Sequence, residues 1–257
     1  MGEEYYRDVY GGSSSSDRLY YSDDYKHEIS RSRVATLKEY LAEGARILDV
    51  GSGRGHFVAA CRAGGYDAWG IEASEAGCAY ARSVLGLDTI LAGYLPDERL
   101  HGEFDVATMW DVVEHLPDPA ATLRAFASQI RPGGRAFIRT GNLRSWAFDK
   151  NRSGWWAWFC DHRFYFSPES LGHILNEVGF DVEAVLNLEK RERPDRTGKQ
   201  GLSDTKIGNG VVAVMKSPSK LALVPRYLHE KWMRRRGLAR YGETYFTPIM
   251  TIVARRR

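Results

Sequence analysis

The sequence lacks three features that mark common classes of protein: long apolar runs, paired cysteines and an apolar leader. It has no stretch of about 18 apolar residues, so it predicts no transmembrane helix. Its three cysteines, Cys61, Cys78 and Cys160, follow no paired spacing. That argues against a disulfide framework or a zinc site and fits a reducing, cytoplasmic compartment. The first residues, Met-Gly-Glu-Glu-Tyr-Tyr, are polar and acidic, so we expect no secretory signal.

The sequence does have the composition of a globular protein, with an uneven distribution of charge. Of 257 residues, 43% are hydrophobic and 27% are charged, and the net charge is +3. Residues 187–257 hold 17 Lys and Arg against 6 Asp and Glu, a net charge of +11, so residues 1–186 carry −8. The basic C-terminal part has two interpretations: a solvated surface, or a contact for an anionic partner.

Short apolar segments alternate with amphipathic ones along most of the chain. We expect strands at 46–50, 67–71, 89–91, 104–110, 135–140, 180–188 and 244–254. We expect helices at 27–43, 55–62, 74–85, 119–130 and 168–178, the last three opened by Ser74, Asp118-Pro119 and Ser167-Pro168. This alternation predicts an α/β fold in which helices cover both faces of a parallel sheet.

Two long segments depart from that alternation, and with the chain ends they define the expected organisation. We expect an N-terminal arm (1–26), a core (27–189) that contains an aromatic segment (142–166), a basic insertion (190–242), and a last strand with a basic tail (243–257). A helix at 218–236 is expected within the insertion. Connections of this length tend to carry function.

The strand at 47–50 runs directly into a glycine-rich turn and then into a helix. Glycines let a ligand approach the backbone closely, and the start of a helix presents N–H groups to it, so the turn predicts a nucleotide-type cofactor. The dinucleotide fingerprint Gly-x-Gly-x-x-Gly fails here, because its third glycine would fall on His56. Glu72, at the end of the second strand, is placed to accept hydrogen bonds from ribose hydroxyls.

Taken in order, these motifs resemble those of class I S-adenosylmethionine-dependent methyltransferases. The residues that carry the resemblance are Ile47–Phe57, Glu72, Phe104–Val106 and Arg131–Gly134. Val113–Leu116 and His162–Leu171 resemble the subgroup related to ubiquinone-biosynthesis methyltransferases. The resemblance covers about residues 25–186 and the last strand. It implies a Rossmann-like, seven-stranded, mostly parallel sheet whose last strand is antiparallel.

The resemblance also implies a set of residues that bind S-adenosylmethionine. They are Arg33, Asp49, Gly51, Gly53, Gly55, Glu72, Ala73, Gly93, Tyr94, Trp110 and Asp111. The three glycines would line the methionine part and the sugar, and Ala73, Gly93 and Tyr94 would flank the adenine. Arg33 would bind the carboxylate and Asp49 the amino group. Trp110 and Asp111 would face the sulfonium.

Methyl transfer to an alcohol or phenol also needs a base, and histidine suits that role near neutral pH. His115 follows the fourth strand and His162 follows the fifth, so both belong to the sheet edge where ligands of open α/β sheets bind. We prefer His162, because it lies in the aromatic segment, although structural roles remain open for both. We expect no metal site, because no tight acidic pair follows either strand.

The aromatic segment is the expected acceptor site. Five of its residues are candidates for substrate contact: Trp146, Trp155, Trp156, Trp158 and Tyr165. Clustered aromatic side chains usually mark sites of contact with a ligand or a partner, and here a planar or sugar acceptor would stack on them. The alternative is that the segment packs on the core as a lid.

The most specific hypothesis is an O-methyltransferase that acts on a secondary metabolite, a sugar or a quinone-like compound. Alternatives are methylation of N or C, a nucleic-acid methyltransferase that uses the basic C-terminal region, and a non-enzymatic scaffold. Nucleic acid is disfavoured because base-reading aromatic motifs are missing. Peripheral membrane contact through 221–236 stays open, as does the choice between monomer and homodimer.

Overall fold

The computed structural model describes residues 22–145, 161–186 and 248–257, together with residues 148, 153, 155, 158, 238 and 239. Most of the N-terminal arm and the basic insertion, including the helix expected at 218–236, therefore lie outside the described residues. The domain boundaries expected for these two segments stay predictions. Among the described helices, there is none with the length and apolar character needed to cross a bilayer.

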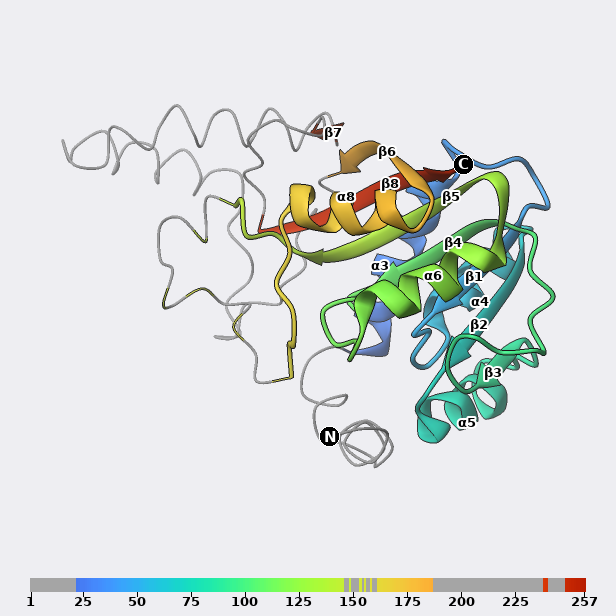
Figure 1. Cartoon of the computed structure of the whole chain (residues 1–257). Coiled ribbons are helices and arrows are strands. Elements are labelled where there is room, and N and C mark those ends of the chain that lie inside the picture. Colours follow the sequence, from blue (N-terminus) through green and yellow to red (C-terminus); the bar gives the residue numbers. More distant parts are fainter. Residues whose placement is uncertain are drawn as a thin grey trace, which may run out of the picture.

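The described strands form one sheet in the order β3-β2-β1-β4-β5-β8-β6-β7 (Figure 1). Their bounds are β1 Arg46–Val50, β2 Asp67–Glu72, β3 Ile90–Ala92, β4 Phe104–Trp110, β5 Ile130–Gly141, β6 Phe180–Leu186, β7 Leu238–Ala239 and β8 Ile249–Arg256. Strands β1 to β5 pair in parallel, whereas β8 is antiparallel to both β5 and β6. The expected seven-stranded, mostly parallel sheet is confirmed, and the two-residue β7 extends its edge.

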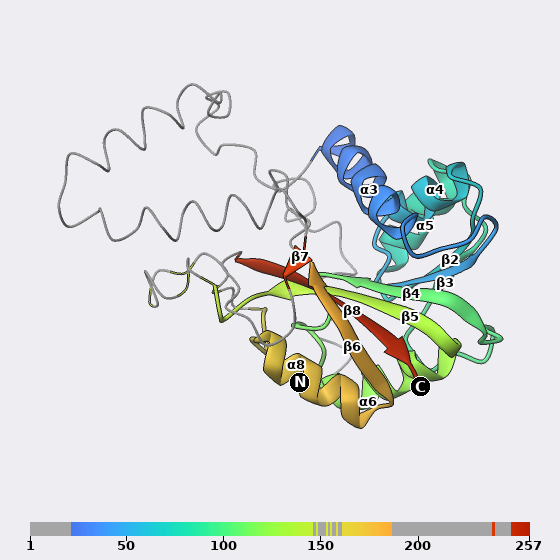
Figure 2. The ribbon, with the colours of Figure 1, turned by 90° about the horizontal axis from the view of Figure 1, so that it is seen from above.

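Among the described residues, five helices cover the two faces of this sheet: α3 Asp23–Leu37, α4 His56–Ala63, α5 Glu75–Ser83, α6 Pro119–Gln129 and α8 Pro168–Glu177. Figure 2 shows α3, α4 and α5 on one face and α6 and α8 on the other. Each face has its own core. Leu37, Phe57 and Phe137 belong to the first, and Phe126 and Phe180 to the second. Burial on both faces explains the nearly continuous apolar character of the central strands.

The helix starts follow from capping side chains that the sequence displays. Ser74 accepts a hydrogen bond from the N–H of Gly77, and Asp118 accepts one from the N–H of Ala121. Ser167 and Ser170 form a reciprocal capping box. These three expected starts are confirmed, because such caps satisfy N–H groups that a helix cannot satisfy internally.

The first helix differs from the expectation at both ends. It begins at Asp23 rather than residue 27, because Ser22 caps it and two acidic residues occupy its first turn. It ends at Leu37 rather than residue 43, where the chain enters a turn with a hydrogen bond from the N–H of Tyr40 to the carbonyl of Leu37. The earlier start places one more turn of helix beside the glycine loop.

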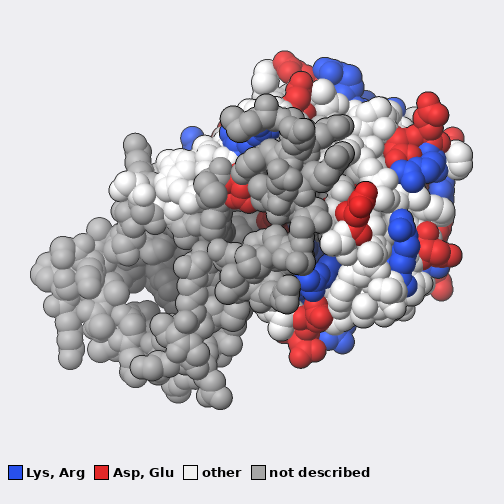
Figure 3. Space-filling model, turned by 90° about the horizontal axis from the view of Figure 1, so that it is seen from below, with Lys and Arg blue, Asp and Glu red and all other residues white. Residues whose placement is uncertain are grey.

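The described surface carries charges of both signs. Figure 3 shows acidic and basic side chains interspersed on its described face. The strongly basic stretch of the sequence lies mainly at residues 187–247, which are described only at 238–239. The structure therefore does not test whether the basic C-terminal region contacts nucleic acid.

Two glycines of the loop allow a matched test of the turn. A Cβ atom at Gly51 (φ +74°) would lie 2.5 Å from Val112 Cγ2, whereas at Gly53 (φ +55°) it would meet no described atom within 4 Å. We expect Gly53→Ala to lower the free energy of unfolding by about 1 kcal/mol, through the positive φ alone. Gly51→Ala adds a clash with a branched side chain, so we expect a loss of about 2–4 kcal/mol. Urea denaturation without cofactor measures both; equal losses would contradict the packing argument.

Candidate functional site

The expected cofactor-binding residues lie along one edge of the sheet, where four neighbouring parallel strands end. Gly51 follows β1, Glu72 closes β2, Gly93 follows β3 and Asp111 follows β4. The pairing of Val50 with Ile71 and Met109, and of Glu72 with Ala92, brings these strand ends level. This is the edge at which open α/β sheets bind ligands.

The glycine loop is built by close packing as well as by backbone conformation. Gly51, Gly53 and Gly55 all have positive φ, a region that disfavours side chains. A Cβ atom at Gly55 would lie 2.8 Å from Leu87, so this glycine, like Gly51, is needed for packing. Gly53 faces open space among the described residues, so it is the loop glycine that a ligand can approach.

Glu72 fastens the loop to the end of β2. One of its carboxylate oxygens accepts a hydrogen bond from the N–H of Gly53 at 2.7 Å, and the other accepts one from the N–H of Ser74 at 2.8 Å. Each carboxylate oxygen has a second lone pair. Glu72 can therefore hold the loop and still accept hydrogen bonds from a bound diol.

A cleft of about 260 Å³ opens between α3 and the ends of β1, β4 and β5. Six of the expected cofactor residues line it: Arg33, Asp49, Gly51, Gly53, Trp110 and Asp111. The other five, Gly55, Glu72, Ala73, Gly93 and Tyr94, lie outside its lining. Of these five, Gly93 is tied to the end of β2 by a hydrogen bond from its N–H to the carbonyl of Glu72 at 2.9 Å, and Tyr94 is 48% exposed.

Arg33 and Asp49 bring opposite charges into this cleft. The Arg33 guanidinium stacks over Trp110, 4.5 Å from the ring centroid, and burial together with Arg139 lowers the Arg33 pKa to about 10. Asp49 is 2% exposed and accepts a hydrogen bond from the Thr108 hydroxyl at 2.6 Å. Burial raises the pKa of Asp49 to about 7, so a cationic ligand group beside it would favour its ionised form.

Arg139 is a functional candidate that the sequence analysis missed. It lies on β5, lines the cleft, is 4% exposed and forms an ion pair with Asp111. Arginine is rarely this buried without a partner, and the sequence alone does not reveal the partner. The one available signal was a charged residue inside an otherwise apolar strand.

His56 belongs to a polar cluster at the start of α3. Its Nε2 lies 3.4 Å from the Asp23 carboxylate, which also accepts a hydrogen bond from the Tyr80 hydroxyl at 2.9 Å. Burial lowers the pKa of His56 to about 4. The imidazole is therefore neutral at physiological pH, and its contacts join the glycine loop to α3.

Two further polar groups of the cleft have no hydrogen-bond partner among the described residues. They are the indole N–H of Trp110 and the hydroxyl of Ser52, both buried. Buried polar groups are normally satisfied, by ligand where not by protein. With Arg33 and Asp49 they fit a ligand that carries both an acid and an amine.

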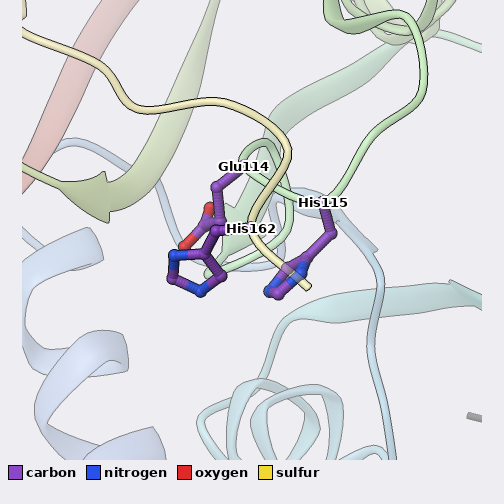
Figure 4. Close-up of side chains that lie close together, drawn as sticks. All are labelled: Glu114, His115 and His162. Atoms are coloured by element: carbon purple, nitrogen blue, oxygen red, sulfur yellow. The ribbon is translucent and has the colours of Figure 1, made fainter. Parts of the chain in front are cut away.

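A second cluster lies at the same sheet edge and joins the loop after β4 to the segment after β5. The rings of His115 and His162 are 4.7 Å apart and nearly perpendicular, and Figure 4 shows them beside Glu114. His115 Nδ1 lies 3.0 Å from the carbonyl oxygen of Asp161. The carbonyl of Glu114 accepts hydrogen bonds from the N–H groups of Arg163 and Phe164, which fixes the two segments together.

Glu114 is the most buried member of this cluster, at 3% exposure. Burial and the nearby Asp111 hold its pKa well above the usual range, and its Oε2 has no hydrogen-bond partner among the described residues. The ligand atoms of Glu114, His115 and His162 lie within 4.8 Å of one another, so these described side chains could hold a divalent cation. No metal was expected from the sequence, because no tight acidic pair follows either strand; here two histidines stand beside a single carboxylate.

The aromatic residues form a contiguous cluster next to His162. Trp158 packs edge-on against Tyr165 at 4.4 Å and against Trp155 at 5.4 Å, and Tyr165 lies 5.8 Å from His162. Trp155 is 3% exposed, whereas Trp158 is 43% exposed. Trp155 is thus core-like and Trp158 open to contact. Trp146 and Trp156 lie outside the described residues.

The comparisons with known proteins settle the family. A family model described as a methyltransferase domain matches residues 21–185, well over half of the chain. The chain belongs to this methyltransferase family. A ubiquinone biosynthesis O-methyltransferase from Pseudomonas aeruginosa (strain UCBPP-PA14) is 30% identical over 177 residues, which cover 63% of this chain and 76% of the relative. The protein of the same name from Stutzerimonas stutzeri is 29% identical over 181 residues, with the same coverage.

Solved structures agree on the fold. Magnesium protoporphyrin IX methyltransferase from Synechocystis PCC 6803 with bound SAH has a TM-score of 0.59 at 15% identity, and covers 99% of this chain and 100% of its own. A SAM-dependent methyltransferase from Thermotoga maritima has a TM-score of 0.56 at 18% identity, and covers 90% of this chain and 91% of its own. The protein is an S-adenosylmethionine-dependent methyltransferase, as the sequence motifs implied.

Asp49 gives a pH prediction for this methyltransferase in the absence of cofactor. Its pKa is about 7 in the folded protein against an ordinary value of 3.8, so between these values the folded state binds the proton that the unfolded chain releases. Wild-type stability therefore falls as pH rises through this window. Asn stays neutral, so we expect Asp49→Asn to gain stability over the wild type, by roughly 2–3 kcal/mol more at pH 8 than at pH 5.

Urea denaturation at pH 5, 6, 7 and 8 measures this difference, and Thr108→Val serves as the control that removes the hydrogen bond but not the carboxyl. A constant gap between Asp49→Asn and the wild type across these pH values would show that Asp49 does not titrate in this window.

Proposed function

We propose that this methyltransferase transfers its methyl group to a hydroxyl oxygen of a small-molecule acceptor. The observation that carries the proposal is the pairing of His115 and His162, 4.7 Å apart, between the donor edge of the sheet and the aromatic cluster. A hydroxyl nucleophile needs a proton acceptor at this position. The O-methyltransferases of Pseudomonas aeruginosa and Stutzerimonas stutzeri, whose names state the same chemistry, support it.

On the donor side, the proposed roles follow the charges and open positions of the cleft. When bound, S-adenosylmethionine supplies an electrophilic methyl group on a sulfonium. Arg33 binds its carboxylate, Asp49 its amino group and Glu72 its ribose hydroxyls. These three contacts fix the donor, so the protein's main contribution is alignment. Ala73, Gly93 and Tyr94 flank the adenine, at the ends of β2 and β3.

On the acceptor side, we propose His115 as the base, in place of the His162 that the sequence analysis preferred. In its neutral form, His115 donates its Nδ1–H to the Asp161 carbonyl at 3.0 Å. Nε2 then carries the lone pair, which is the form that accepts a proton. His162 packs against His115 and orients it.

The proposed acceptor is planar and largely apolar, such as a phenolic secondary metabolite or a quinol-like compound. The support is the half-open Trp158, which packs on Tyr165 next to the histidines. Flat aromatic surfaces favour stacked or edge-on aromatic partners. A sugar acceptor fits the same surface less well, because its many hydroxyls would need polar partners.

The base assignment is tested by substitution. With a panel of phenols, catechols and quinols and isotopically labelled S-adenosylmethionine, we expect His115→Gln to lower kcat by roughly 10²–10⁴-fold, the usual contribution of a general base. Affinity for S-adenosylhomocysteine should stay unchanged. His162→Gln should lower kcat less, because it removes only packing on His115.

Two controls separate the alternatives. If kcat falls on treatment with a chelator and returns with Mg²⁺ or Zn²⁺, the histidines act with Glu114 as metal ligands rather than as a base. If no oxygen acceptor of the panel is methylated while amines are, the O-directed proposal is wrong and the donor-side assignments remain.

A further inference from the structure

Asp111 occupies an unusual position between two arginines. It directly follows β4 with φ +60°, a left-handed conformation that few residues other than glycine adopt, although Asp tolerates it better than most. Its N–H donates to the carbonyl oxygen of Arg139 at 3.1 Å. Its carboxylate forms an ion pair with the guanidinium of the same Arg139. One residue of β5 thus holds both the backbone and the side chain of Asp111.

The second arginine is Arg33, across the cleft on α3. Its Nη2 lies 3.6 Å from the Asp111 carboxylate, which is 42% exposed. Both guanidiniums are largely buried, with side-chain exposures of 17% for Arg33 and 5% for Arg139. A single carboxylate therefore lies between two buried cations. The more closely it pairs with Arg33, the less strongly Arg33 can attract another anion.

We propose that Arg139 is a positioning residue for cofactor binding: it holds Asp111 back from Arg33, so that Arg33 binds the carboxylate of the cofactor. This inference rests on the proposed role of Arg33. Without Arg139, Arg33 is the cation that still lies beside the Asp111 carboxylate among the described residues. Asp111 then closes on Arg33 and competes with the incoming carboxylate for the same guanidinium, whose planar fork suits either acid.

Arg139 thus acts on the ligand indirectly, through Asp111 and Arg33. Because Arg139 already holds the Asp111 carboxylate away from Arg33, a ligand carboxylate can bind Arg33 without first breaking a close ion pair. The cation–π contact of Arg33 with Trp110, at 4.5 Å, keeps the guanidinium at the cleft wall in the meantime. The two arginines and the one Asp111 carboxylate thus leave net positive charge at this point of the cleft wall, which suits the carboxylate of the cofactor.

The test uses the full chain and two probes, measured by isothermal titration calorimetry. S-adenosylhomocysteine has the amino-acid carboxylate, and 5′-methylthioadenosine lacks it. We expect Arg139→Met to weaken S-adenosylhomocysteine binding by roughly ten- to a hundredfold, the effect of one charge-assisted hydrogen bond. Binding of 5′-methylthioadenosine should not change. Arg139→Lys, which keeps the charge, should retain most of the affinity.

The decisive variant is the double substitution Arg139→Met with Asp111→Asn. Asn has nearly the shape of Asp and tolerates the same positive φ, but it does not compete for Arg33. We expect it to restore S-adenosylhomocysteine affinity. If the double variant binds as weakly as Arg139→Met, then Arg139 contacts the carboxylate itself or acts only through the fold, and the inference is overturned. An Arg139→Met variant that binds as the wild type does also overturns it.

Asp111→Asn alone keeps the inference testable should Arg139→Met fail to fold. Because Arg139 already holds this competitor aside, Asp111→Asn should bind S-adenosylhomocysteine as tightly as the wild type or more tightly, and weaker binding would contradict the proposal. Arg33→Met separates this result from a failure of the proposed function. If Arg33→Met binds S-adenosylhomocysteine normally, the assigned role of Arg33 is wrong. If it loses affinity while Arg139→Met does not, only the role of Arg139 is wrong.

Discussion

The proposed donor half of the site depends on carboxylates placed where parallel strands end. Asp49 lies on β1, Glu72 closes β2 and Asp111 follows β4, so strand pairing alone brings the three acids to one edge. Each is held by a different kind of partner: the Thr108 hydroxyl, the backbone N–H groups of Gly53 and Ser74, and the guanidinium of Arg139. Because each acid has its own partner, the three carboxyls stay separate at this edge, and burial raises the pKa of Asp49 to about 7.

The acceptor half is tied to this edge through the main chain. The carbonyl of Glu114 accepts two N–H groups from the segment after β5, so the loop that begins at Asp111 and the segment that carries His162 behave as one unit. The hydrogen bond from His115 to the Asp161 carbonyl adds a side-chain link between the same two segments. Only a few residues of chain therefore separate Asp111 from the paired histidines.

The sequence predicts best what local chemistry decides. Ser74, Asp118 and Ser167 predict helix starts because a capping side chain acts within three residues of itself. The order of apolar strands and helices predicts the sheet, and the acids at strand ends predict the donor edge. The predicted end of the first helix at residue 43 was wrong. The structure ends α3 at Leu37, because the apolar residues at 40 and 41 continue a helical pattern whose hydrogen bonds the chain does not continue.

Contacts between distant segments were beyond the reach of such reasoning. Arg139 was not singled out from the sequence, because its partner Asp111 is 28 positions away and only strand pairing unites them. The sequence placed His115 and His162 at the same edge of the sheet. Their ring contact could not be predicted, because it depends on how the 142–166 segment folds back toward the loop after β4. The isolated bridge between Asn142 and Phe166 closes that return, and no pattern in the residues between them encodes it.

Glu114 joins these two halves electrostatically. Its carboxyl is buried between the donor edge and the histidines, and the charge of Asp111 is one cause of its raised pKa. A protonated Glu114 avoids a second negative charge beside Asp111, so Asp111 stays available to Arg139. Burial of one carboxyl thus leaves Asp111 as the anion that lies between Arg33 and Arg139.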